Sequence, residues 1–210
     1  MNYIKDHIPK SKDKRPGTKI VPEYITIHST GNPNSTARNE RGWLTNPSNT
    51  RTASWHIVVD EKEAIEAIPL DEIAYHAGNS NGNNKSIGIE ICESGNREKT
   101  LENAVKLVAK MLHERNWGVD KLRRHYDWSG KVCPRILSSN NWEGWNAFKI
   151  QVQRELDRLK NTVKIRYKGK LYEVDGYLKD GRNYVQLRET FEKLGFIVDW
   201  DNDKKEVIIK

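Results

Sequence analysis

The sequence lacks the features that place a chain in a membrane or hold it together with disulfides. Its 210 residues contain no run of about 18 apolar residues, the length that spans a bilayer. The N-terminus has no apolar core of a signal peptide, so any export must use another route. Only two cysteines are present, Cys92 and Cys133, and they make no disulfide framework. These absences favour a globular chain made in a reducing compartment.

The sequence also has no region in which charge of one sign is concentrated. The net charge is +7, but the lysines and arginines are spread along the chain. A basic protein can meet nucleic acid, an acidic membrane or an anionic polymer such as cell wall. No cluster of aromatic and basic residues resembles a nucleic-acid motif, so a nucleic-acid function would rest on net charge alone.

The sequence patterns predict two domains. Alternating, β-branched segments predict strands, and apolar residues at helical spacing predict helices. Strands mixed with long helices indicate an α/β domain that ends near residue 160. The tail, 161–210, has its own turns and predicts a small α+β domain. The predicted strands are 24–29, 54–60, 64–69 and 86–92, and the predicted helices are 35–44, 100–116 and 141–159; we expect little regular structure in 1–20.

The loop from His125 to Pro134 contains several side chains suited to metal binding or catalysis. It offers an imidazole and a thiol, and zinc accepts both nitrogen and sulfur. Their spacing is too wide for a zinc-finger knuckle, so another ligand must come from elsewhere. The candidates are His28, His56 and His76, each of which is also open to a structural role; His28, at the end of a strand, is best placed. Three protein ligands with an open position are typical of catalytic zinc.

Three further residues are candidates for catalysis or for orienting a metal ligand. Glu90 lies in the middle of the apolar strand 86–92 and resembles a general base, or else a buried carboxylate paired with a cation. Lys131 is suited to stabilising an oxyanion, although loop lysines are usually only solvated. Asp127 is a candidate for orienting a ligand histidine from behind, or for capping a turn.

These segments together resemble a known family, the type-2 N-acetylmuramoyl-L-alanine amidases, in the branch of Bacillus and Clostridium phage endolysins and autolysins. The resemblance covers roughly residues 3–160; each motif alone is weak, and the set in this order is specific. The motifs are Tyr24-Ile-Thr-Ile-His28-Ser-Thr-Gly31, Ser54-Trp-His56, Tyr75-His76-Ala-Gly78, Ser86-Ile-Gly-Ile-Glu90 and His125-Tyr-Asp-Trp-Ser-Gly-Lys131-Val-Cys133-Pro134.

The resemblance implies a fold and a site. The fold is a central mixed sheet flanked by helices, with a zinc in a groove. The implied zinc ligands are His28, His125 and Cys133, and the implied catalytic residues are Glu90 and Lys131. It also places His76 beside the substrate groove, where we expect Trp55 and His56 to contact substrate as well. Many members carry Tyr where this chain has Trp55, which leaves proton transfer to Glu90.

The implied function is hydrolysis of peptidoglycan at the amide between N-acetylmuramic acid and L-alanine, in an enzyme that reaches the wall after lysis or through a holin-type pore. The alternative is a peptidoglycan-binding module with a structural metal and no turnover. The tail is similar to the small domain at the N-terminus of some copper amine oxidases, yet residues 161–210 contain no His, Cys or Met to bind copper. For the tail we expect wall binding or self-association into a homo-oligomer.

Overall fold

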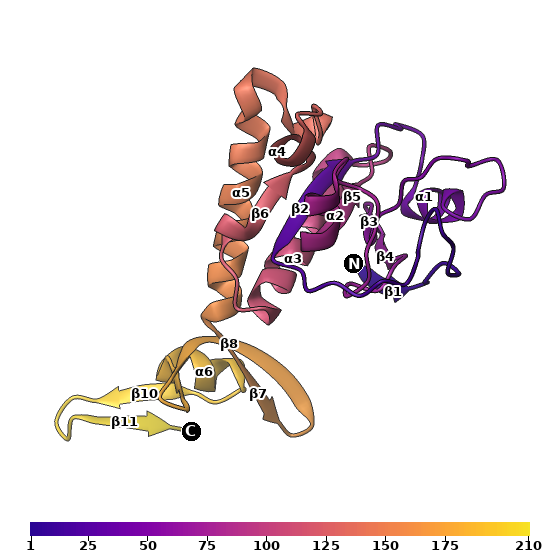
Figure 1. Ribbon diagram of the computed structural model, residues 1–210. Coiled ribbons are helices and arrows are strands. Elements are labelled where there is room, and N and C mark those ends of the chain that lie inside the picture. The colour runs from indigo at the N-terminus through magenta and orange to yellow at the C-terminus, as the bar shows by residue number, and fades with distance from the viewer. The chain divides into compact units, whose positions relative to one another are not determined.

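The computed structural model describes residues 1–210, which form two compact units, Met1–Glu155 and Leu156–Lys210. Figure 1 shows the helices and strands of both units along the chain. No helix is long and apolar enough to cross a membrane.

The first unit is built on a six-stranded mixed sheet in the order β1-β4-β3-β5-β2-β6. Neighbouring strands are parallel except for β3 and β4, which are antiparallel. This arrangement confirms the predicted α/β class with a central mixed sheet. The strands are β1 (Asn2–Lys5), β2 (Tyr24–Ser29), β3 (Ile57–Val59), β4 (Glu63–Glu66), β5 (Ser86–Ile91) and β6 (Leu122–Arg124).

Helices pack on this sheet, and its central strands are buried on both faces. Helix α3 packs against β3 and β5, and Asn96 caps its first turn. Ala37 of α1 contacts Val58 and Cys92, which lie on the same face of the sheet as Glu90. The helices are α1 (Ala37–Trp43), α2 (Ser80–Lys85), α3 (Arg97–Glu114), α4 (His125–Ser129) and α5 (Ser139–Lys160), with short 3-10 turns at Val119–Lys121 and Arg135–Leu137.

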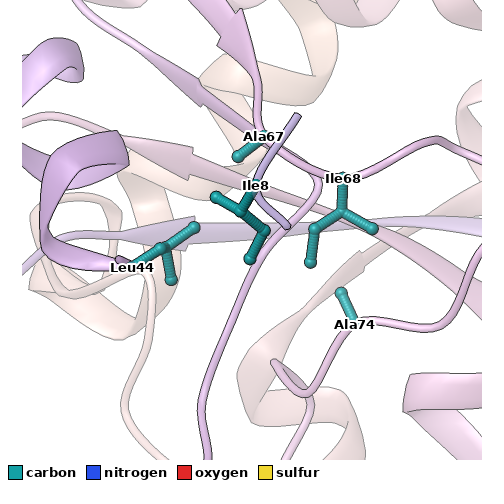
Figure 2. Close-up of a cluster of buried hydrophobic side chains, with 5 residues drawn as sticks. All are labelled: Ile8, Leu44, Ala67, Ile68 and Ala74. Carbon is teal, nitrogen blue, oxygen red and sulfur yellow. The ribbon is translucent and has the colours of Figure 1, made fainter. Parts of the chain in front are cut away.

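The N-terminal segment is more ordered than its polar sequence indicates. Residues 2–5 form β1, which pairs in parallel with β4 at the edge of the sheet. Ile8 follows and is only 1% exposed. It sits in an apolar cluster with Leu44, Ala67, Ile68 and Ala74 (Figure 2). The expectation of little regular structure in 1–20 was therefore wrong for the first residues. Strand β1 and the buried side chain of Ile8 anchor them to the first unit.

The second unit consists of two small antiparallel sheets and one helix. Its first sheet contains β7 (Thr162–Tyr167), β8 (Lys170–Lys179) and β9 (Arg182–Val185), and its second contains β10 (Val198–Asp201) and β11 (Glu206–Ile209). The helix is α6 (Leu187–Lys193). The hairpin turns at Lys168-Gly169 and Asp180-Gly181 have positive φ at both residues, the backbone of a type I′ turn, which glycine and aspartate tolerate.

Candidate metal centre and active site

His28 from one part of the chain and two residues from another, His125 and Cys133, direct nitrogen and sulfur atoms toward one point. His28 lies near the end of β2, His125 begins α4, and Cys133 lies in the loop after that helix. Nδ1 of His28 is 3.1 Å from Nδ1 of His125 and 3.8 Å from Sγ of Cys133. All three side chains are buried, and their donor atoms lie within 4.8 Å of one another.

This spacing matches that of a tetrahedral metal site. Zinc binds nitrogen at about 2.0 Å and sulfur at about 2.3 Å, so tetrahedral ligands lie about 3.3 Å apart for two nitrogens and about 3.5 Å for nitrogen and sulfur. The observed separations of 3.1 and 3.8 Å are close to both values. The donor set and its geometry therefore fit a zinc ion.

Burial also sets the protonation of the donors. It lowers the pKa of His28 well below the ordinary value and that of His125 to about 4, and it raises the pKa of the Cys133 thiol to about 12. Without a metal, the cluster holds two neutral imidazoles and a protonated thiol at pH 7. A bound cation is what would stabilise the thiolate, so binding releases the thiol proton.

Glu90 lies directly beside the cluster. It is the register partner of His28 on the neighbouring parallel strand, and its Oε1 is 4.0 Å from Nδ1 of His28. Its side chain is 15% exposed, and Oε2 has no hydrogen-bond partner. Burial raises the pKa of Glu90 to about 8. The pairing with a cation that we considered from the sequence is absent, so this carboxylate is held next to the metal position with one oxygen unengaged.

Lys131 stands at the same site, on its solvent side. Gly130 ends α4 with a left-handed backbone, and Lys131 follows as an exposed residue two positions before Cys133. After burial, the charge of Lys131 is the next cause that lowers the pKa of His125. The exposed ammonium group of Lys131, on the loop that supplies the thiol, is therefore near enough for its charge to act on the cluster.

The structure places His76 and His56 behind the cluster, away from solvent. His76 is 7% exposed and His56 is fully buried. Nδ1 of His76 is 3.0 Å from Nε2 of His28, and its Nε2 is 3.2 Å from the carbonyl oxygen of Ser86. His56 accepts from the N–H of Gly88 and donates to the carbonyl of Glu72. Both nitrogens of each ring are therefore engaged within the protein, and contact of either histidine with substrate stays a prediction.

The contacts of Trp55 and Asp127 in the structure are packing and helix capping. Trp55 packs against two buried apolar clusters, under α1. Asp127 caps α4: its carboxylate accepts from the backbone N–H and the guanidinium of Arg124. Asp127 therefore contacts no histidine, and it supports His125 only by fixing the start of the helix that carries it. The indole of Trp55 contributes to packing, so the expected contact with substrate gains no support.

The sequence patterns did not single out an ion pair that anchors the loop of Cys133. Nε of Arg135 is 2.9 Å from Oε1 of Glu93, which also accepts from the N–H of Gly31. The N–H of Arg135 donates to Oγ of Ser29. The loop that carries the thiol is thus tied to the ends of β2 and β5. Neither residue belongs to a local motif, and only the folded chain brings them together.

A groove of about 1030 Å³ opens just beyond His28. It begins at Thr30 and Gly31, which directly follow β2, and runs along α1. Its lining is rich in amides and guanidinium groups: Asn32, Asn34, Arg38, Asn39, Asn46 and Arg51, with Trp43 as an exposed ring. Such a wall can pair with amides, hydroxyls and carboxylates.

Comparison with known proteins identifies the family. Residues 16–136, more than half of the chain, match the family model described as N-acetylmuramoyl-L-alanine amidase. The chain belongs to the N-acetylmuramoyl-L-alanine amidase family. Among curated members, CwlA of Bacillus subtilis is 42% identical over 168 residues, which is 76% of this chain and 60% of that protein. CwlH of the same species is 36% identical over 203 residues, covering 93% of this chain and 79% of that protein.

Solved structures of this amidase family share the fold of the first unit. The catalytic domain of XlyA is 39% identical with a TM-score of 0.67, and the match covers 72% of this chain and 99% of that one. The structure of PlyL is 34% identical with a TM-score of 0.65, covering 73% and 98%.

The rest of the chain matches a different family model. Residues 151–210 match the copper amine oxidase N-terminal domain. The chain spans 60% and 43% of the length of the relatives CwlA and XlyB of Bacillus subtilis. An amidase unit is therefore combined here with a small second domain.

Proposed function

We propose that this chain is a zinc-dependent hydrolase of bacterial peptidoglycan that cleaves the amide between N-acetylmuramic acid and the L-alanine of the stem peptide. The observation that carries the proposal is the buried His28–His125–Cys133 cluster with Glu90 beside it. The family supports the choice of bond, and the amide-rich groove beyond His28 suits a substrate of sugars and peptides.

His28, His125 and Cys133 would hold the zinc. When bound, zinc supplies a Lewis acid that polarises the scissile carbonyl and makes water more acidic. Three buried donors leave room for a further ligand, the arrangement of catalytic rather than structural sites. Cys133 gives up its proton on loading, because its thiolate is unstable in this buried position without a cation.

Glu90 would act as the general base and then as the general acid. Its unengaged Oε2 is free to accept a proton from the attacking water and to deliver it to the departing amine. Burial raises the carboxyl pKa, which makes the carboxylate a stronger base than a solvated one. Lys131 would donate a hydrogen bond to the oxyanion that develops on the substrate carbonyl.

The direct test is mass spectrometry of purified cell wall digested with the full chain. New free amines on L-alanine and free lactyl groups on the muramic acid are expected, and they should disappear with a chelator and return with added zinc. Wall that remains intact under zinc-loaded conditions would instead support the non-catalytic binding module.

The two cysteines provide a matched pair of variants for the metal assignment. Cys133→Ser should lose zinc stoichiometry and turnover. Cys92→Ala, in the apolar cluster with Val58 and Ile65, should keep both. Full zinc content in Cys133→Ser would contradict the ligand assignment.

We further propose that the chain serves as an endolysin or autolysin that reaches the wall from the cytoplasm by lysis or through a holin-type pore. Expression in a host with and without a co-expressed holin tests this. Lysis that depends on the holin supports the proposal, and lysis without any release device contradicts it.

For the second unit we propose cell-wall binding, through a groove of about 660 Å³. Tyr177 and Tyr184 lie opposite each other on β8 and β9, with rings stacked at 5.2 Å and half exposed. Amide and acidic groups line the same groove at Asn161, Asp175 and Gln186. Aromatic rings flanked by planar polar groups suit sugar rings, whose C–H faces pack on aromatics while their hydroxyls hydrogen-bond.

Co-sedimentation with purified wall in chelator, where no turnover occurs, tests the role of this groove. Tyr177→Ala should reduce binding about tenfold or more, which corresponds to about 1.4 kcal/mol. Leu178→Ala changes a residue on the other face of β8 that is even more exposed than Tyr177, and this variant should bind as wild type. Equal binding to the wall by both variants would contradict the proposal. If Tyr177→Ala changed only the sedimentation coefficient of the protein itself, the groove would instead mediate self-association.

A further inference from the structure

The two nitrogens of His28 face different partners. Nδ1 faces the other two donors of the metal cluster, His125 and Cys133. Nε2 points the other way and lies 3.0 Å from Nδ1 of His76. Two ring nitrogens at this distance share one hydrogen, so the structure allows only two arrangements of that proton. In one, His28 is the donor; in the other, His76 is.

The other side of His76 decides between them. Its Nε2 is 3.2 Å from the carbonyl oxygen of Ser86. A carbonyl only accepts, so Nε2 of His76 carries the hydrogen and donates it. A neutral ring that donates through Nε2 has a bare Nδ1, which accepts from Nε2–H of His28. His28 then keeps its own Nδ1 bare, with the lone pair directed at the metal position.

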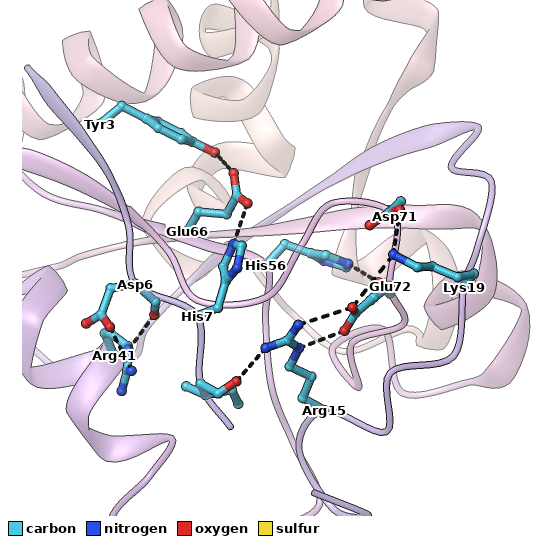
Figure 3. Close-up of polar contacts among 11 residues, drawn as sticks. Tyr3, Asp6, His7, Arg15, Lys19, Arg41, His56, Glu66, Asp71 and Glu72 are labelled. Carbon is cyan, nitrogen blue, oxygen red and sulfur yellow. Dashed lines mark hydrogen bonds and ion pairs between the residues drawn. The ribbon is translucent and has the colours of Figure 1, made fainter. Parts of the chain in front are cut away.

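His76 itself is held rigidly. A Cβ on residue 88 would lie 2.5 Å from Cγ of His76, so only glycine lets the ring lie against β5. The ring of His56 stands edge-on to it, with centroids 5.6 Å apart. His56 is fixed in turn by the N–H of Gly88 and by the carbonyl of Glu72, the second of which is drawn in Figure 3. The N–H of His76 donates to Oδ1 of Asn83.

We propose that His76 is a positioning residue that fixes the tautomer of His28 and so presents Nδ1 to the metal. The inference rests on the proposed zinc function, and it assigns to a neutral imidazole the place that a carboxylate or backbone carbonyl usually occupies behind a metal-bound histidine. A neutral partner leaves the thiolate of Cys133 as the only negative charge among the ligands.

The tautomer can be read without any variant, by long-range ¹H–¹⁵N correlation NMR of the full chain with ¹⁵N-labelled histidine. In the metal-free protein His28 and His76 should both show the pattern of a ring protonated at Nε2. After zinc is added, Nδ1 of His28 should shift as a metal-bound nitrogen. A proton on Nδ1 of either ring in the metal-free protein would overturn the inference.

Two substitutions then test the consequence for the metal. His76→Leu removes the acceptor and should weaken zinc binding about 10- to 100-fold in chelator competition. His76→Asn keeps an acceptor near the position of Nδ1 and should recover most of that loss. Gly88→Ala, which displaces the ring, should act like His76→Leu. His113→Asn on the surface of α3 is the control.

The outcomes separate the two levels of the proposal. If wild type binds no zinc, the proposed function fails, whereas the tautomer pattern still stands or falls by the NMR spectrum. If wild type binds zinc and His76→Leu, shown to be folded by circular dichroism, binds it equally well with an unchanged His28 spectrum, the role of His76 is refuted. The Co²⁺ ligand-field spectrum of each variant provides a readout that does not depend on turnover.

Discussion

His28 and Glu90 are register partners on adjacent parallel strands, with Nδ1 of His28 4.0 Å from Oε1 of Glu90. The pairing of β2 with β5 thus places the proposed metal ligand His28 and the carboxylate of Glu90 side by side, with no loop between them. Groups held on strands are positioned more precisely than groups on loops. The carboxylate is consequently kept next to the metal position at the expense of its own solvation, and this trade-off has consequences for activity and for stability.

Glu90→Gln should abolish most of the turnover and leave the metal in place. The amide has nearly the same shape but cannot take up a proton, and general-base catalysis contributes about 10²- to 10⁴-fold. We expect kcat on a soluble muramoyl peptide to fall by about that factor, with zinc content unchanged by elemental analysis. Glu98→Gln, in the first turn of α3, is the control. Unchanged kcat in Glu90→Gln would exclude it as the base.

The same substitution should stabilise the metal-free protein at neutral pH. Burial raises the pKa of Glu90 to about 8, so this group favours the unfolded state as pH rises from its unfolded value toward 8. The free energy of unfolding of the glutamine variant should exceed that of wild type by about 3 kcal/mol at pH 7 and by less than about 1 kcal/mol at pH 5. Urea denaturation in chelator measures both. A gain that is equal at the two pH values would point to packing and not to ionisation.

The sequence predicted the strands at the centre of the site more reliably than the elements at its rim. β2 and β5 were predicted because alternation and β-branched residues are local signals. α4 was expected to be a loop, because five residues carry no helical periodicity; the Asp127 cap and the packing of α4 on β6 make it a helix. β1 was missed since its only partner, β4, lies some sixty residues away.

The choice among His28, His56 and His76 shows the same limit. All three follow or lie within short apolar segments, and spacing along the chain cannot say which ring faces Cys133. Parallel pairing of β2 with β6 leads the chain into His125 beside His28, while Ser86 and Gly88 on β5 draw His76 and His56 to the rear. These are relations between strands, and they exist only once the sheet is formed.

Arg15 should prove important for stability although it lies in a polar N-terminal segment. Its guanidinium forms two hydrogen bonds with the buried carboxylate of Glu72 and a third with the carbonyl of Ile8 (Figure 3). Arg15→Ala leaves that carboxylate without its main partner, and we expect a loss of about 2 kcal/mol in the free energy of unfolding.

Lys19→Ala provides the comparison, since Lys19 reaches the same carboxylate at 3.7 Å from an exposed position. Exposed ion pairs contribute little, so thermal denaturation of Lys19→Ala should match that of wild type. Equal losses in the two variants would show that burial of Glu72 is not the reason for the effect of Arg15.

His56 should make the metal-free protein sensitive to mild acid. Burial in the protein interior lowers its pKa to about 4. A second proton would also place Nδ1–H against the N–H of Gly88. The unfolded chain takes up that proton near pH 6.5, so stability is complete above this pH and is lost as the pH falls toward 4. Between pH 7 and pH 5 this histidine alone should cost about 2 kcal/mol. We expect the pH dependence of the unfolding free energy, measured in chelator, to be smaller by that amount in His56→Gln. His113→Gln, exposed on α3, should keep the wild-type slope; if His56→Gln also keeps it, the acid sensitivity arises from the other buried histidines.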